Sequence, residues 1–209
     1  MTSPPAAVEV FTIGFELDAE PLAATLSPAE RARAARFASL EHERRWAIAH
    51  GALRAILAAR MGCAPATVAF GAGEHGKPEV DGGPRFSLSH CDDLALVAVA
   101  EAEVGVDVEP VTRRVDAVPR VLTPAELASV AAGDREGLLR LWCRKEALAK
   151  ARGTGLAVEP ERLDTTRPGP FALLDLEIPG HVAALAVAAE APQVSLRAFR
   201  GATSSDWAP

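Results

Sequence analysis

The sequence predicts an α+β protein made of two similar halves, residues 1–102 and 103–209, that pack together as a pseudo-dimer. Two observations predict this fold. The same order of elements occurs twice, namely a strand, a short capped helix, a long helix, a loop and antiparallel strands. Each short helix also begins with a capping box that has proline at its first position, Ser27–Glu30 and Thr123–Glu126. Because clefts between packed halves are common ligand sites, we expect the active site to lie between them.

The elements of the first half are predicted from apolar periodicity, helix caps and turn residues. Its capped helix runs to Phe37, and its long helix ends at Gly62, where leaving a helix favours positive φ. The other expected elements are a strand at Val8–Glu16, the long helix at Leu40–Met61, a Gly- and Pro-rich loop at Gly71–Gly83, and strands at Arg85–His90 and Leu94–Glu101.

The second half is predicted by the same rules. Its long helix spans Leu138–Leu156 and is closed by Gly153 and Gly155. The other expected elements are a strand at Val104–Glu109, a helix from the Thr123 cap to Ala131, and strands at Phe171–Glu177, His181–Ala189 and Val194–Arg200.

Composition narrows the classes of function. The chain has 209 residues, of which 49% are apolar and 24% charged, with a net charge of −6. This acidic balance argues against a nucleic-acid or anionic-membrane binder. The N-terminus lacks the pattern of a signal peptide, and no apolar run is long enough to span a bilayer. The three cysteines are widely spaced and offer no disulfide framework or metal-ligand spacing, so we expect reduced thiols in a cytoplasmic protein.

Two acidic side chains share one face of a predicted strand. In Val104–Glu109 the valines alternate with the other residues, which places Asp107 and Glu109 on the same side, about 6.5–7 Å apart. Such a pair could hold a hard cation such as Mg²⁺, with waters and phosphate oxygens completing the coordination. A solvated acidic face is the alternative. Glu146 on the long helix could supply a third ligand or a base.

The long helix of the second half carries charges within its apolar arc. Lys145 falls near the middle of that arc and Glu146 near its edge. Lys150 follows Glu146 at i+4, so a plain surface pair is the alternative. Since unpaired charges are costly to bury, we expect this helix to present its carboxylate and lysine to a polar group.

Other residues could bind an anion. Ser89 and His90 end the strand before the acidic one, although a strand-end histidine is commonly structural, and no G-x-S-x-G elbow supports a hydrolase triad. Lys77 lies between glycine and proline in a loop. The early helices are rich in arginine. The guanidinium groups could bind phosphate oxygens, and solvent-exposed helix faces are the alternative. From the residues alone, the interpretation is a Mg²⁺-dependent enzyme that acts on a phosphate-bearing ligand.

Taken in order, these segments resemble the Sfp-type 4′-phosphopantetheinyl transferases. The resemblance covers Ser27 to Leu156 and rests on Arg45 with Arg54, GKP at Gly76–Pro78, FSLSH at Phe86–His90, VGVDVE at Val104–Glu109 and WCRKEALAKARGTGL from Trp142. It implies a pseudo-dimer with coenzyme A in the cleft. It also implies transfer of 4′-phosphopantetheine from coenzyme A to a serine of an acyl or peptidyl carrier protein, with release of adenosine 3′,5′-bisphosphate. Fatty-acid, polyketide and nonribosomal-peptide carriers all fit this implication.

The resemblance further implies roles for single residues at the pyrophosphate. Lys150 would contact the pyrophosphate and assist the leaving group. Either Glu126 or Glu146 would take the proton of the carrier serine. The residues implied to hold Mg²⁺ are Asp107, Glu109 and Glu146.

A second group of residues is implied to bind the nucleotide and the 3′-phosphate of coenzyme A. These residues are Arg45, Lys77, Ser89 and His90. The chain departs from the family at Glu30, where a lysine for the 3′-phosphate is common. Arg33, one turn further along, could take that role.

Two alternatives use the same residues differently. A Mg²⁺-dependent nucleotide-pyrophosphate hydrolase would use water as nucleophile, but no additional acidic cluster for water activation is present in the sequence. A non-catalytic coenzyme A-binding protein would be expected to have lost one of the catalytic groups, and all are present. Because one chain accommodates both halves, we expect a monomer rather than the trimer of the short holo-synthase branch.

Overall fold

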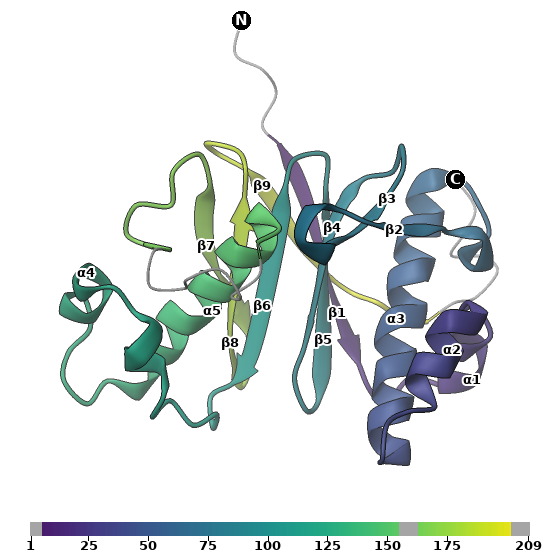
Figure 1. Cartoon of the computed structure of the whole chain (residues 1–209), viewed down its shortest axis with the longest axis horizontal. Helices are drawn as coiled ribbons and strands as arrows, with labels where there is room; N and C mark the ends of the chain where they lie inside the picture. The colour runs from purple at the N-terminus through teal and green to yellow at the C-terminus, as the bar shows by residue number, and fades with distance from the viewer. Residues whose placement is uncertain (1–5, 155–162, 202–209) are drawn as a thin grey trace, which may run out of the picture.

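The computed structural model describes residues 6–154 and 163–201, which form a mixed α+β fold (Figure 1). The predicted fold class is confirmed. The strands are β1 (Ala7–Gly14), β2 (Phe70–Ala72), β3 (Pro78–Val80), β4 (Arg85–His90), β5 (Leu94–Ala100), β6 (Val104–Pro110), β7 (Ala172–Ile178), β8 (His181–Val187) and β9 (Gln193–Ala198). They form a sheet ordered β4-β5-β1-β9, a sheet ordered β6-β8-β7 and a two-stranded ribbon of β2 and β3.

The two capping boxes that the sequence predicts are present, and α3 ends at Gly62 as predicted. In both capping boxes the hydroxyl side chain accepts from the backbone N–H of the glutamate, and the carboxylate accepts in return from the backbone N–H of the cap residue. The helices are α1 (Ala19–Ala23), α2 (Pro28–Ala34), α3 (Leu40–Met61), α4 (Pro124–Ala128) and α5 (Arg135–Arg152), with 3₁₀ turns at Pro65–Thr67, Glu74–Gly76 and Val118–Val121. No described helix combines the length and apolarity that a membrane span needs.

Each long helix packs on one sheet, and Figure 1 shows α3 and α5 on opposite sides of the molecule with the strands between them. On the first sheet, Ile48 and Leu57 of α3 pack with Ile13, Phe86 and Val97. The rest of the buried face of α3 combines alanines with Leu53 and Ile56, which belong to the same core.

The second sheet is in direct contact with the backbone of α5 at Gly105. A Cβ atom added at Gly105 of β6 would lie 2.0 Å from the Ala147 carbonyl oxygen and 2.4 Å from the Ala151 nitrogen. The glycine therefore permits direct backbone contact between β6 and α5, because any side chain at this position would overlap the helix. This contact holds α5 against the strand that carries Asp107.

The two sheets share a third apolar core. Val10 of β1 and Leu96 of β5 pack with Val106 of β6 and Leu185 of β8. At this junction β4 lies beside β6, and the Val106 N–H donates to Ser87 Oγ at 3.1 Å. The ends of these two neighbouring strands therefore come together between the sheets.

The order of strands repeats in the two halves. The order β4-β5-β1 in the first sheet corresponds to β7-β8-β6 in the second, with antiparallel pairing throughout. The last strand breaks the repeat, because β9 pairs in parallel with β1 and thus joins the first sheet. The division at residue 102 stays a prediction, and the predicted second half includes this strand of the first sheet.

Several local predictions differ from the structure. The capped helix α2 ends at Ala34 instead of Phe37, and α1 was not predicted. The predicted loop at Gly71–Gly83 contains β3 and part of β2. The α4 helix stops at Ala128 instead of continuing to Ala131. The α5 helix begins before Leu138, because Asp134 Oδ1 accepts from the Gly137 N–H at 2.8 Å and caps it. Its end at Gly153 is observed with φ +73, whereas the predicted end at Leu156 lies outside the described residues.

Candidate active site

A lysine, a serine and an aspartate from three different elements meet where the two sheets join. Asp107 on β6 is 4% exposed, and its Oδ1 accepts from Lys150 Nζ at 2.7 Å and from Ser89 Oγ at 2.8 Å. Lys150 on α5 also donates to Ser89 Oγ at 3.0 Å and to the Val106 carbonyl at 3.1 Å. These bonds fix the ammonium group at the edge of the two strands, with its charge beside the carboxylate.

The second carboxylate oxygen of Asp107 has no partner. Oδ2 is buried and makes no hydrogen bond within the described structure. A buried carboxylate oxygen is costly to leave unsatisfied, so a charged or polar ligand at this position would be stabilising. The chemistry of the donor suits a hard divalent cation.

Glu109 lies one strand repeat beyond Asp107 and is paired with an arginine. The Arg113 guanidinium donates to Glu109 Oε1, and its carbon lies 5.2 Å from the centroid of the Trp142 ring. The side chain of Glu109 is only 15% exposed. Arg113 therefore neutralises Glu109, as Lys150 does Asp107.

Glu146 faces this acidic group from α5. Burial is the main cause that raises the pKa of its carboxyl to about 7, and the negative charge of Asp107 raises it further. Lys150 acts in the opposite direction without cancelling these effects. At neutral pH the Glu146 carboxyl is thus divided between its protonated and ionised forms.

The three predicted metal ligands are close neighbours, but they are not drawn together around one point. Among the described residues, the group that brings three possible ligand atoms within 4.8 Å of one another is a different one, Cys91, Asp93 and His181. The reason lies in the ion pairs of the site, because Lys150 holds Asp107 and Arg113 holds Glu109. A cation binding here would have to replace Arg113 at Glu109.

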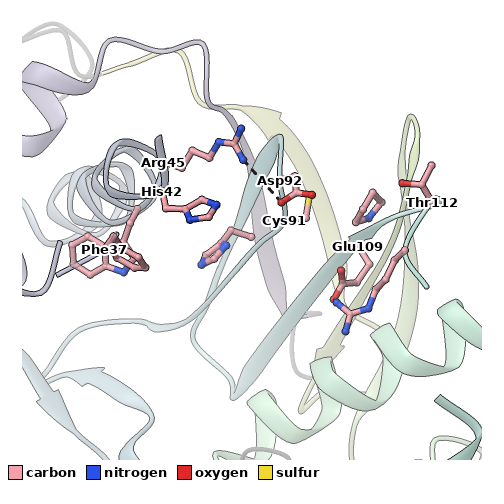
Figure 2. Close-up of a pocket in the computed structure, with 11 residues that line it drawn as sticks. Phe37, His42, Arg45, Cys91, Asp92, Glu109 and Thr112 are labelled. Carbon is pink, nitrogen blue, oxygen red and sulfur yellow. Dashed lines mark hydrogen bonds and ion pairs between the residues drawn. The ribbon is translucent and has the colours of Figure 1, made fainter. Parts of the chain in front are cut away.

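A hollow of about 580 Å³ opens beside these residues (Figure 2). Arg45 and His42 of α3 form one wall, and Glu109 and Thr112 form the opposite wall. The turn after β4, at Asp92, lies between them. The hollow is therefore lined by both predicted halves.

A second hollow, of about 490 Å³, shares His90 and Trp46 with the first. Lys150 and Lys77 also line it. Lys150, which is paired with Asp107, is thus accessible from the second hollow. The two hollows together extend from Glu109 past His90 to Lys77. This length and the charges along it suit an extended ligand that carries several phosphates.

His90 and Arg45 both line the first hollow, and His90 also lines the second. His90 is exposed at the end of β4, where partial desolvation lowers the pKa of its imidazole and the nearby Lys150 charge lowers it further. Arg45 Nε donates to Glu41 at 2.8 Å, and another of its nitrogens lies 4.0 Å from Asp92. The predicted binding of an anion by these two residues stays a prediction.

Lys77 and Arg33 both line the second hollow. Lys77 Nζ lies 2.9 Å from a Glu103 carboxylate oxygen and donates to the Val104 carbonyl at 3.2 Å and the Ala151 carbonyl at 3.4 Å, so it ties the β2–β3 ribbon to α5. Arg33 places its guanidinium 5.8 Å from the centroid of the Trp46 ring.

With this geometry in view, comparison with known proteins identifies the family. Residues 103–187 match the sequence model of the 4′-phosphopantetheinyl transferase superfamily. The 4′-phosphopantetheinyl transferase HetI of a Nostoc species is 36% identical over 199 residues, which cover 83% of each chain. The chain belongs to this superfamily. The 4′-phosphopantetheinyl transferase of Bacillus subtilis is 29% identical over 65% of this chain and 63% of its own, and AcpT of Salmonella typhi is 34% identical over 51% and 60%.

Glu126 of this transferase makes its contacts away from the acidic group, and its predicted role in proton transfer stays a prediction. Its carboxylate is fully buried, where Oε2 lies 2.8 Å from Lys145 Nζ and accepts from the Thr123 N–H, while Oε1 accepts twice from Thr165. Lys145 and the hydrogen bonds lower the pKa of this carboxyl against the opposing effect of burial. With both oxygens occupied, Glu126 has a structural role.

The same arrangement explains Glu30, where the transferase departs from the family pattern. Glu30 Oε2 lies 2.7 Å from a nitrogen of the buried Arg54, which also donates to the carbonyls of Pro65 and Val68. Each capping-box glutamate is therefore paired with a basic residue of the following long helix. Neither Glu30 nor Arg54 is free to bind phosphate, whereas Arg33 lines the hollow.

The sequence interpretation missed three residues that line the site of the transferase. Trp46 and His50 stack with ring centroids 3.7 Å apart and an interplanar angle of 19°. Burial lowers the pKa of His50 to about 4, so the stacked imidazole is neutral. Their i,i+4 spacing was the available signal, but it is also common in helix cores. Arg113 was missed because a loop arginine has no periodicity to place it.

Proposed function

We propose that this transferase moves 4′-phosphopantetheine from coenzyme A to a serine of an acyl or peptidyl carrier protein and releases adenosine 3′,5′-bisphosphate in a Mg²⁺-dependent reaction. One observation supports this most strongly. A buried aspartate binds Lys150 through one oxygen and leaves the other without a partner, beside hollows lined by cationic side chains. Phosphoryl transfer depends chiefly on alignment and charge neutralisation, which such a group can provide.

The residues present fit a divalent cation. Asp107 Oδ2, Glu109 and Glu146 would hold it, and a bound Mg²⁺ would supply charge neutralisation of the pyrophosphate. The buried Oδ2 of Asp107 has no hydrogen-bond partner, and burial together with the charge of Asp107 raises the pKa of Glu146, so a cation bound here would be stabilising. Arg113 would then leave Glu109 and could turn toward the phosphates.

The protein side chains would divide the remaining work between binding and proton transfer. Lys150 would contact the pyrophosphate and stabilise the negative charge of the leaving group. Glu146 would accept the proton of the carrier serine, because its carboxyl lies on α5 close to both Asp107 and Lys150. We favour Glu146 over Glu126 for this role, because the oxygens of Glu126 are occupied in the interior.

The nucleotide end of coenzyme A would extend along the hollows toward the first half. We propose that Arg45 and His90 bind the 3′-phosphate and that Arg33 replaces the lysine common in the family. Lys77 and Ser89 would support the nucleotide and the phosphates. The monomeric state and the cytoplasmic location stay predictions of the sequence.

Replacing His90 by alanine is expected to raise the KM for coenzyme A about tenfold with little change in kcat, because one hydrogen bond to a charged phosphate is lost. The decisive comparison uses 3′-dephospho-coenzyme A, whose KM should not rise further in the variant. His42→Ala, which removes another imidazole from the same hollow, is the matched control. An equal loss with both substrates would show that His90 does not bind the 3′-phosphate.

A hydrolase of nucleotide pyrophosphates is the alternative that uses the same side chains. The two functions differ in the nucleophile, so release of adenosine 3′,5′-bisphosphate should be measured with and without an apo carrier protein. The proposal expects release only when the carrier is present. Release at the same rate without carrier would favour the hydrolase, and binding of coenzyme A without any release would favour a non-catalytic role.

A further inference from the structure

A second group of possible metal ligands lies beside the first hollow, which only its Cys91 lines. Cys91 and Asp93 belong to the turn between β4 and β5, and His181 is the first residue of β8. One ligand atom from each residue lies within 4.8 Å of the other two. The turn belongs to the first sheet and His181 to the second, so the group bridges the two sheets.

The orientation of His181 is suited to metal binding. Its Nδ1 lies 2.8 Å from the Pro179 carbonyl oxygen, and its Nε2 lies 2.8 Å from Asp93 Oδ1. Metal-binding histidines commonly donate one ring N–H to a backbone carbonyl, which leaves the other nitrogen for the ion. The side chain of His181 is 6% exposed, so contacts with surrounding protein atoms fix the orientation of the ring.

The other two ligands already lie at short range. Cys91 Sγ is 3.2 Å from Asp93 Oδ1, and Asp93 is 64% exposed on its outer side. In a tetrahedral zinc site, bond lengths near 2.0–2.3 Å place neighbouring ligand atoms about 3.4–3.6 Å apart. Small side-chain rotations therefore suffice to admit an ion between the three ligand atoms. The exposed side of Asp93 would let a water molecule take the fourth coordination position.

We propose that Cys91, Asp93 and His181 bind a thiophilic divalent cation of the Zn²⁺ class and that this ion joins the two sheets. A thiolate, an imidazole and a carboxylate favour Zn²⁺ over the hard Mg²⁺. Binding displaces the proton of the Cys91 thiol, and any proton on His181 Nε2, into solvent. The ion holds the turn that follows His90, and Cys91 itself lines the hollow in Figure 2.

The cysteine spacing in the sequence does not reveal this group. Cys63, Cys91 and Cys143 are far apart in the sequence, and the partner histidine lies in the other sheet. Only the pairing of strands and the packing of the two sheets bring the three ligands together. The proposal does not depend on the reaction of the transferase, so it can fail while the proposed function stands.

The test uses Co²⁺ with the full chain, because a thiolate bound to Co²⁺ gives a charge-transfer absorption that oxygen and nitrogen ligands do not. The wild-type protein is expected to show this absorption with one equivalent bound, and excess Mg²⁺ should not remove it. Cys91→Ser should abolish the absorption. Cys63→Ser, which removes a partly buried thiol elsewhere, is the matched control and should retain it.

A second measurement separates binding from folding. Zn²⁺ should raise the melting temperature of the wild type and of Cys63→Ser, and Asp93→Asn should weaken Zn²⁺ binding at least about tenfold while leaving the far-ultraviolet circular dichroism unchanged. Because the Asp93 side chain is exposed, this variant is expected to fold as the wild type does. Absorption that is missing from the wild type, or that persists in Cys91→Ser, would overturn the proposal.

Discussion

Asp107→Asn is expected to lower the rate of phosphopantetheine transfer by at least about 100-fold, because it removes the charge at the centre of the site. The amide keeps the size of the side chain but weakens the 2.7 Å contact with Lys150. It also replaces the orphaned oxygen by a weaker ligand for a cation. The measurement is the initial rate of holo-carrier formation across a Mg²⁺ titration, in which the variant should also require more Mg²⁺.

Asp116→Asn is the matched control for this variant. Asp116 pairs with Arg114 at 2.9 Å on the surface, where its side chain is 66% exposed. Exposed ion pairs contribute little, so this variant should keep the wild-type rate. Full activity of Asp107→Asn with an unchanged Mg²⁺ requirement would contradict the assignment of Asp107 as a metal ligand.

Lys145→Met is expected to lower the free energy of unfolding by about 3–5 kcal/mol, because it leaves the buried Glu126 carboxylate without its cation. Both side chains of this pair are 0% exposed. Urea unfolding followed by circular dichroism gives the difference. Arg140→Met removes one member of the exposed pair with Glu136, 2.9 Å apart, and should cost no more than about 1 kcal/mol.

The structural role of Glu126 can be separated from catalysis by replacing both partners. In Glu126→Gln combined with Lys145→Met, the amide oxygen can still accept from Thr165, the bond from the Thr123 N–H to the other oxygen is lost, and no charge remains buried. We expect the double variant to recover part of the stability lost in Lys145→Met and to transfer phosphopantetheine once folded. A folded double variant without activity would return Glu126 to the catalytic residues.

The long elements of the fold could be predicted because local signals define them. The bounds of α3 agree with the prediction, since Gly62 ends the helix at φ +63. Pairings between distant strands could not be predicted, and the parallel pairing of β9 with β1 is the clearest case. Strand partners depend on packing across the whole chain, and the residues of β9 give no local sign of their partner.

The candidate site shows a similar division between local and long-range information. The alternation in β6 predicted that Asp107 and Glu109 share one face. The contact between Asp107 and Ser89 could not be predicted, because it depends on β4 lying beside β6. The position of Lys145 within an apolar arc correctly indicated a buried polar partner. The sequence could not show that this partner was Glu126, because a capping-box glutamate and a catalytic glutamate look alike in a sequence.

The central claim is that the carboxylates and Lys150 between the two sheets form the centre of a phosphopantetheine transfer site. Intact-mass spectrometry of apo acyl and peptidyl carrier proteins, incubated with the transferase, coenzyme A and Mg²⁺, tests it most directly. The account predicts that a carrier gains the mass of one phosphopantetheine with the wild type and does so far more slowly with Glu109→Gln. An unchanged carrier mass while coenzyme A stays bound, or an equal gain with Glu109→Gln, would contradict it.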